Sequence, residues 1–133
     1  MTGREAWAGR TPAELLRHRG PALLLAAIET FDGETIACTS RREGPWPWPL
    51  VLEGAAQTAG LLAGLAGGLS NRAVIAEYRG VVVHVERHDG PISFRARIER
   101  RLLHFWRCRI EGRAADGALL LEGRVSLAPG AGD

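Results

Sequence analysis

One carboxylate lies in an otherwise apolar stretch of the chain. Between Leu50 and about Leu69 there is no basic residue, and the only acidic one is Glu53. Burying a carboxylate is unfavourable unless it is paired or used in chemistry. Gln57 follows one helical turn later, so its amide can orient Glu53 or bind a substrate. We therefore predict that Glu53 works as a general acid or base, with Gln57 beside it.

A structural role for Glu53 is the alternative. Pro49 is well placed as the first residue of a helix, which puts Glu53 in its first turn. A carboxylate there can accept free N–H groups and interact favourably with the helix dipole. The same N–H groups can polarise a carbonyl such as that of a thioester. Gly54, next to Glu53, and Trp46 and Trp48, just before the helix, are further candidates for substrate binding.

The residues that follow Pro49 predict a buried helix. From Pro49 to about Gly67 the chain is apolar nearly all round, which is typical of a helix enclosed by its own domain. The uncharged run after Glu53 has 16 residues, 5 of them glycine, whereas crossing a bilayer takes about 20 apolar residues. A membrane span is therefore not expected. Small residues that predict close packing against a sheet or second helix recur at every fourth position: Ala56, Gly60, Gly64 and Gly68.

Strand patterns flank this helix on both sides. Ala22 to Phe31 and Glu34 to Ser40 are joined by Asp32-Gly33, a strong hairpin signal. Strands with one apolar and one polar face are expected at 73–86, 92–98, 106–111 and 119–125. This order predicts an α+β fold in which one antiparallel sheet wraps one long helix. We expect a single domain over 1–133, with a flexible N-terminal extension at 1–14 and a flexible tail at 128–133.

Composition indicates one globular domain in the cytoplasm. The chain has 133 residues, of which 46% are hydrophobic and 24% charged. Its first 19 residues carry charges and no apolar block, so they are not expected to act as a secretory signal. Cys38 and Cys108 are therefore expected to be buried thiols and not a disulfide. No histidine has the spacing of a metal site, so no metal and no cofactor is expected.

The basic residues gather in one part of the chain. Seven arginines lie between Arg95 and Arg113, although the formal net charge is only +2. Such a strip either steers an acidic partner, such as an acidic carrier protein, or forms the solvated outer face of a sheet. Nucleic acid is not expected, because the strip lacks a helix-turn-helix, zinc or aromatic-rich RNA-binding signature.

Two motifs resemble the β-hydroxyacyl-acyl-carrier-protein dehydratases. The first, Leu-Arg-His-Arg-Gly-Pro-Ala-Leu-Leu-Leu from Leu16, looks like the Leu-Pro-His-Arg opening of that family. The second, Leu-Glu-Gly-Ala-Ala-Gln-Thr-Ala-Gly from Leu52, is similar to the Glu-Ala-Met-Ala-Gln-x-x-Gly start of the family's central helix. The likeness runs from about Leu15 to Leu127. It implies a hotdog fold, a dimer, and a substrate held as a thioester on an acyl carrier protein or coenzyme A.

The family's catalytic histidine has no counterpart here. The resemblance implies that Glu53 works with a histidine of the opposite subunit, carried by a Gly-His-Phe-Pro-Gly loop just before the helix. This chain has Glu-Gly-Pro-Trp-Pro-Trp from Glu43 instead, a proline-rich segment expected to be a loop. Glu53 and Gln57 therefore carry over and the histidine does not. The base is either His18, from the first motif, or a group supplied by a paralogous hotdog chain in a heterodimer.

Three functions remain open. The leading one is dehydration of a 3-hydroxyacyl thioester in fatty-acid or polyketide biosynthesis, in which Glu53 protonates the departing hydroxyl and the helix N-terminus binds the carbonyl. The second is a hotdog thioesterase, in which Glu53 activates water or attacks the carbonyl. The third is a catalytically silent subunit that binds acyl carrier protein or completes a heterodimer.

Overall fold

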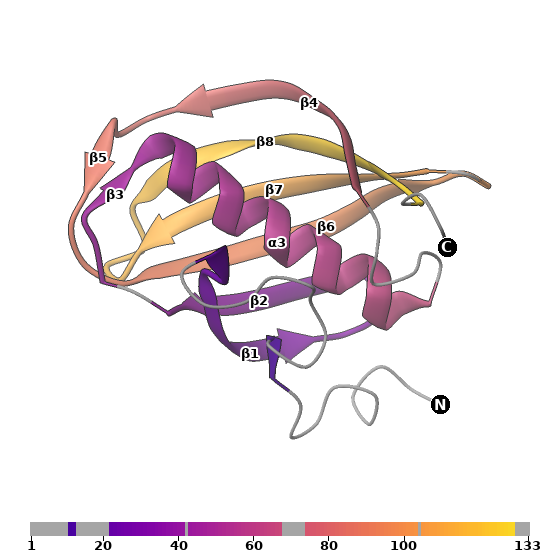
Figure 1. Cartoon of the computed structure of the whole chain (residues 1–133), viewed down its shortest axis with the longest axis horizontal. Coiled ribbons are helices and arrows are strands. Elements are labelled where there is room, and N and C mark those ends of the chain that lie inside the picture. Colours follow the sequence, from indigo (N-terminus) through magenta and orange to yellow (C-terminus); the bar gives the residue numbers. More distant parts are fainter. Residues whose placement is uncertain (1–10, 13–21, 42, 68–73, 104, 130–133) are drawn as a thin grey trace.

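Six antiparallel strands form one sheet that curves around a long helix (Figure 1). The structure is a computed structural model and describes residues 11–12, 22–41, 43–67, 74–103 and 105–129. In sheet order the strands are β1 (Leu25–Phe31), β2 (Thr35–Ser40), β6 (Ile92–Arg101), β7 (Trp106–Ala114), β8 (Leu119–Ala128) and β4 (Val74–Val83). The α+β architecture predicted from the sequence is confirmed, since one helix, α3 (Trp48–Ala66), lies against this sheet.

The β1–β2 hairpin forms as its turn residues dictate. The Asp32 carboxylate accepts hydrogen bonds from the backbone N–H groups of Glu34 and Thr35, at 2.9 and 2.8 Å. These two bonds hold the pKa of Asp32 below its usual value. Gly33 adopts a positive φ of 98°, a conformation that glycine reaches without steric penalty. The hairpin prediction is therefore confirmed.

Helix α3 begins and ends one residue before the predicted bounds. Pro49 occupies its second position, and Gly67 ends it with a left-handed φ of 83° while donating its N–H to the Gly64 carbonyl. The helix is long and apolar enough to meet a length criterion for a membrane span. It lies instead across the inner face of the sheet, against β6 and β7 (Figure 1). Its apolar character is that of a core helix.

Helix and sheet approach each other closely at Gly54. A Cβ atom at this position would lie 2.4 Å from the ring of Phe94 on β6. Gly64, one of the small residues predicted to pack closely, has nothing within 4 Å of where its Cβ would be. The expectation of close packing is therefore wrong at Gly64. Gly54 instead allows the helix to pack closely on the sheet, and Gly112 of β7 does the same opposite Val51.

The inner face of the sheet supplies the rest of the core. Alternate residues of β6, β7 and β8 are almost completely buried, among them Phe94, Ile110 and Val125. Cys38 and Cys108 are free and buried on the same face, and burial raises the pKa of each thiol to about 12. The prediction that they are buried thiols is confirmed.

The segment before the helix differs from the predicted loop. Trp46–Pro47 forms a two-residue strand, β3, which pairs with β5 (Arg87–His88). Trp46 is fully buried, and its ring meets Phe94 edge to face at 5.8 Å. Anchoring this side chain in the core holds the segment extended, and a proline in so short a pairing removes no interior ladder bond. Most of the expected extension at 1–14 and tail at 128–133 lies outside the described residues.

Two glycine-to-alanine variants of α3 should change stability in opposite directions. Alanine favours the helix at both positions by up to about 1 kcal/mol. At Gly64 the new methyl group meets nothing, so Gly64→Ala should raise the melting temperature. At Gly54 it collides with Phe94, so Gly54→Ala should lower the free energy of unfolding by about 1–3 kcal/mol. Thermal denaturation of both variants tests the placement, and equal effects would contradict it.

Candidate active site

Glu53 is the sixth residue of α3, in its second turn, and is half-buried. The sequence placed it in the first turn, and this is wrong, because one turn spans only 3.6 residues and Glu53 lies beyond it even when counted from Pro49. The first turn contains no acidic residue, and no side chain caps the helix, whose N-cap is Pro47. The capping alternative for Glu53 is therefore excluded. Its carboxylate projects from the side of the helix.

Gln57 joins Glu53 to the chain that leads into β1. The Gln57 side chain is 3% exposed. Its carbonyl oxygen accepts the Leu24 N–H at 3.0 Å, and its amide nitrogen donates to the Ala22 carbonyl at 2.6 Å. The same nitrogen donates to Glu53 Oε1 at 3.4 Å. Because the two backbone bonds fix the rotamer of Gln57, the amide presents an N–H to Glu53 in a set direction.

Tyr78 brings a second polar group near the carboxylate. It lies on β4, directly opposite Val125 of β8, and so shares the inner face of the sheet. Burial, and secondly the negative charge of Glu53, raise the pKa of Tyr78 to about 12. The phenol therefore stays protonated, and it lies near enough to Glu53 for that charge to affect its pKa. The sequence analysis missed this residue, although it is the only tyrosine and follows a strand pattern.

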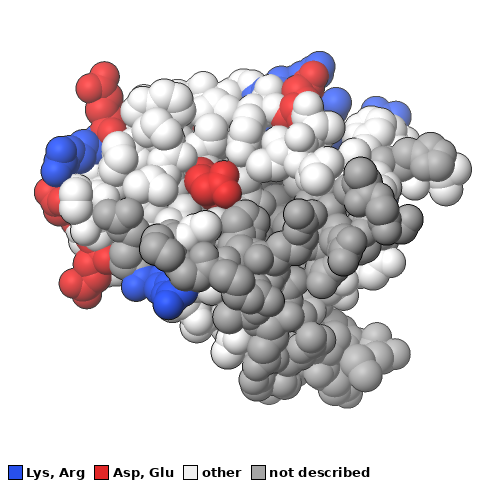
Figure 2. Space-filling model, viewed as in Figure 1, with Lys and Arg blue, Asp and Glu red and all other residues white. Residues whose placement is uncertain are grey.

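The helix N-terminus has few N–H groups to offer. Trp48 donates its N–H to the Glu86 carbonyl at 2.9 Å, and Pro49 has none. Val51 donates to the Pro47 carbonyl in the first intrahelical bond, so Leu50 alone remains as a donor for a carbonyl oxygen at this helix end. Figure 2 shows that the described surface over α3 and β4 is mostly uncharged, apart from one acidic group near the middle of the view and charged groups at its margins. An apolar acyl chain would meet little charge on this face.

The other predicted substrate-binding residues occupy different surroundings. Trp46 is in the core, whereas Trp48 is 39% exposed at the start of the helix. Gly54 is buried and in the helix interior, where its place is set by Phe94. The structure thus brings Glu53, Gln57 and Tyr78 into one neighbourhood, leaves Trp48 open at the helix start, and uses Trp46 and Gly54 in packing.

The described histidines lie on other parts of the fold. His18, the candidate base, falls outside the described residues. His84 contacts Glu122 at 2.8 Å, and His88 belongs to β5, opposite Trp46. Among the residues that the structure describes, no group of three or more His, Cys, Asp or Glu side chains is arranged to hold a metal ion.

Solved structures with the same architecture are numerous, although sequence similarity is low. No family model matches the chain, and no curated protein matches it in sequence. It is similar to the dehydratase heterocomplex ApeI:P from Xenorhabdus doucetiae, with a TM-score of 0.74 and 17% identity over 89% of this chain and 90% of that one. The chain has the hotdog fold.

Hotdog thioesterases give further matches. One is a mutant thioesterase from Pseudomonas aeruginosa, with a TM-score of 0.65 and 15% identity over 95% of this chain and 89% of that one. Another is a hypothetical thioesterase from Streptococcus pneumoniae with coenzyme A, with a TM-score of 0.64 and 10% identity over 76% of this chain and 82% of that one. The structural neighbours thus include both a dehydratase heterocomplex and thioesterases.

Removing the Gln57 amide should destabilise the fold. In Gln57→Leu the buried Leu24 N–H loses its acceptor, which should lower the free energy of unfolding by about 1–3 kcal/mol. Glu53→Gln is the matched control, since it leaves both backbone bonds of Gln57 in place and should change stability by less than about 1 kcal/mol. Chemical denaturation measures both, and a Gln57→Leu protein as stable as the control would contradict the role of this amide.

Tyr78 should titrate late, and the single tyrosine makes this measurable by ultraviolet absorption. The pKa of Tyr78, read as the midpoint of this titration, is expected to be about 12, above the ordinary tyrosine pKa of 10.0. Because the folded state holds this proton more tightly than the unfolded state, stability should fall as the pH rises from 10 to 12. In Glu53→Gln the midpoint should drop but stay above 10, since burial, the larger cause, remains. An unchanged midpoint would show that Glu53 is not close to the phenol.

Proposed function

We propose that this protein takes part in the dehydration of 3-hydroxyacyl thioesters, held on an acyl carrier protein or coenzyme A, in fatty-acid or polyketide biosynthesis in the cytoplasm. The observation that carries the proposal is the half-buried Glu53 held by Gln57 on the central helix of a hotdog fold. The resemblance of the Leu52–Gly60 motif to the dehydratase helix and the match to a dehydratase heterocomplex support it.

In the proposed reaction a base removes the α-proton of the substrate, and Glu53 protonates the β-hydroxyl as it leaves as water. The product is an enoyl thioester. Gln57 orients the Glu53 carboxyl through its amide N–H. The protonated Tyr78 phenol can donate to the thioester carbonyl as negative charge develops there, together with the N–H group of Leu50.

The base is proposed to come from a second, paralogous hotdog chain. In the resembling family it is carried by the loop before the helix of the opposite subunit, and here that position is filled by the buried Trp46. A partner with an intact Gly-His-Phe-Pro loop would complete one site with Glu53. The reciprocal site would face this chain's segment before the helix, which has no histidine, and would stay inactive. The similarity to a heterocomplex supports this arrangement, and self-sufficiency through His18 is the competing outcome.

Strand β4 supplies the surface for such a partner. It is the last strand of the sheet, and its far edge pairs with no other strand among the described residues. It also carries exposed apolar side chains: Val74 at 44%, Ile75 at 38%, Tyr78 at 38% and Val82 at 48%. A long apolar edge is a site of strand addition or aggregation unless it is covered. Pairing through β4 would place Tyr78 and the Glu53 site near the partner.

Thioester hydrolysis is the second candidate, favoured by the similarity to several thioesterases. In that case Glu53 would activate water or attack the carbonyl, and the product would be a free acid. A silent subunit that binds acyl carrier protein without turnover is the third possibility.

Replacing Glu53 should abolish turnover without loss of the fold. With 3-hydroxyacyl carrier as substrate and the paralogous partner present, Glu53→Gln should reduce enoyl formation by about 100-fold or more, because a general acid contributes roughly 10²–10⁴-fold. Mass spectrometry of the product separates enoyl thioester from free acid. Equal activity in the wild type and Glu53→Gln would exclude Glu53 as the acid, and free acid alone would favour the thioesterase.

The protein should be a dimer at micromolar concentration, formed through β4. Val82→Glu introduces a charge at this edge and should weaken dimerisation by about tenfold or more, since unpaired charges are unfavourable in an interface. Leu103→Glu is a suitable control, because Leu103 is 87% exposed in the β6–β7 connection. Sedimentation equilibrium distinguishes the two variants, and a monomeric wild type would contradict the proposed interface.

A further inference from the structure

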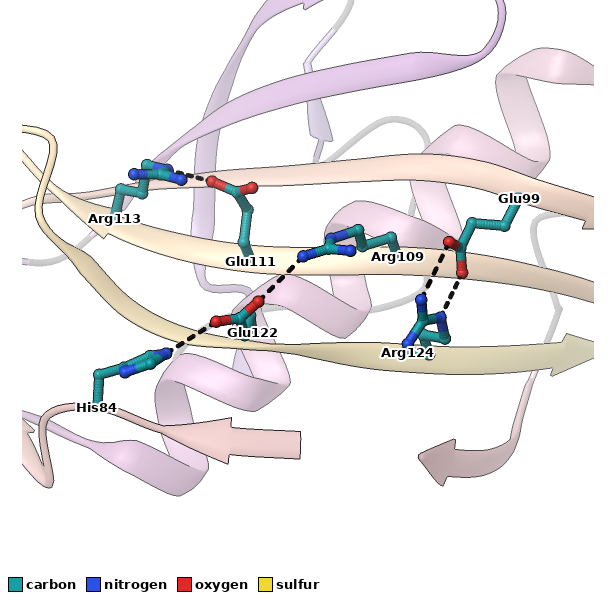
Figure 3. Close-up of polar contacts among 7 residues, drawn as sticks. All are labelled: His84, Glu99, Arg109, Glu111, Arg113, Glu122 and Arg124. Carbon is teal, nitrogen blue, oxygen red and sulfur yellow. Dashed lines mark hydrogen bonds and ion pairs between the residues drawn. The ribbon is translucent and has the colours of Figure 1, made fainter. Parts of the chain in front are cut away.

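The outer face of the sheet carries an array of paired charges (Figure 3). Glu99 of β6 accepts hydrogen bonds from Arg124 of β8, the nearer at 2.7 Å. Glu122 of β8 accepts from Arg109 of β7 at 3.0 Å and contacts His84. Glu122 thus pairs with a cation of the neighbouring strand β7, whereas Arg124 reaches Glu99 across β7, so each of these two carboxylates has a cation beside it.

Glu111 and Arg113 form a pair that leaves a neighbouring arginine without a carboxylate. Arg95 of β6 lies directly opposite Glu111 of β7 in the strand register. Glu111 nevertheless accepts from Arg113 Nε, two residues along its own strand (Figure 3). Arg113 is held further by a bond from its Nη1 to the Gly117 carbonyl at 2.9 Å. Within the part of the chain that the structure describes, Arg95 therefore has no carboxylate partner.

Both arginines line a trough on this outer face, of about 400 Å³. Its lining crosses four neighbouring strands, from Glu29 on β1 through Thr39 on β2 and Ser93 on β6 to Arg113 on β7. Thr39 and Ser93 face each other, as do Ser93 and Arg113, so these three side chains form one row. At about 4.8 Å per strand the row from β1 to β7 is roughly 14 Å long.

The trough is thus polarised along its length. One end has two guanidinium groups, of which Arg113 is fixed in place by its own bonds and Arg95 is available. The middle has the hydroxyl groups of Thr39 and Ser93, which can donate or accept. The other end has the carboxylate of Glu29. Donors at one end and an acceptor at the other suit a ligand with the opposite polarity.

We propose that this trough binds a phosphorylated small molecule that carries an amino or hydroxyl group distant from its phosphate. Guanidinium groups match phosphate geometry with parallel hydrogen bonds, and hydroxyl groups can satisfy the third phosphate oxygen. Glu29 accepts the hydrogen bond or ion pair of the far group and repels a bare phosphate. The site lies on the face of the sheet opposite α3, so it is separate from the Glu53 site.

Isothermal titration calorimetry at low ionic strength, with three probes, tests the proposal. Glucosamine 6-phosphate should bind more tightly than glucose 6-phosphate, and both more tightly than inorganic phosphate. Arg95→Gln should weaken all three by about tenfold, as expected for loss of a hydrogen bond to a charged group. Arg97→Gln is the matched control, because Arg97 is the next outward residue of the same strand and is not part of the trough. The affinities of the Arg97→Gln variant for the three probes should stay within about twofold of those of the wild type.

Glu29→Gln gives the most decisive result, since it should change the affinities for two of the probes in opposite directions. Removing the negative charge should strengthen binding of inorganic phosphate and weaken binding of glucosamine 6-phosphate. Parallel NMR titrations should shift the amide signals of Thr39 and Ser93. Absence of binding by all three probes would overturn the proposal. Equal effects of Arg95→Gln and Arg97→Gln on affinity would also overturn it. So would a Glu29→Gln variant whose affinities for inorganic phosphate and glucosamine 6-phosphate change in the same direction. None of these outcomes depends on dehydration activity.

Discussion

The buried amide of Gln57 is the contact on which the arrangement around Glu53 depends. It satisfies a backbone N–H and a backbone carbonyl of the chain leading into β1, and the same group reaches the carboxylate one turn earlier. A helix that is otherwise apolar thereby gains a polar connection to the sheet's first strand. Since the amide cannot rotate without breaking two backbone bonds, the direction of its N–H toward Glu53 is set by the fold.

A steric constraint at Gly54 complements this polar one. The helix can lie close to β6 only because no Cβ stands between Gly54 and Phe94. Phe94 in turn meets Trp46, so the segment before the helix, the helix and the central strand are joined in one block of packing. Glu53 directly precedes Gly54 on the helix, and Gln57 follows three residues after it. The separation of the two sheet faces follows from the same strand alternation: the inner face encloses the helix, and the outer face carries the arginine and glutamate pairs.

Much of this architecture is predictable from local sequence. The Asp32-Gly33 turn, the apolar run after Pro49 and the alternating strands each depend on neighbours in the chain, and each forms as predicted. The site is less predictable because its contacts are long-range. Gln57 was expected beside Glu53, but its bonds to Ala22 and Leu24 join residues more than 30 positions apart. The position of Tyr78 depends on the pairing of β4 with β8, and the trough beside Arg95 on the register of four strands. The depth of Trp46 was also missed, since prolines on either side indicated only a loop.

The central claim is that Glu53 supplies the acid of a dehydration site whose base comes from another hotdog chain. The most direct measurement is enoyl formation from 3-hydroxyacyl carrier by this chain alone, by a paralogous partner with the Gly-His-Phe-Pro loop alone, and by the two together. The account predicts turnover by the mixture that exceeds either chain alone and is lost with Glu53→Gln in this chain or with alanine at the partner's loop histidine. Turnover by this chain alone, undiminished in Glu53→Gln, would contradict it.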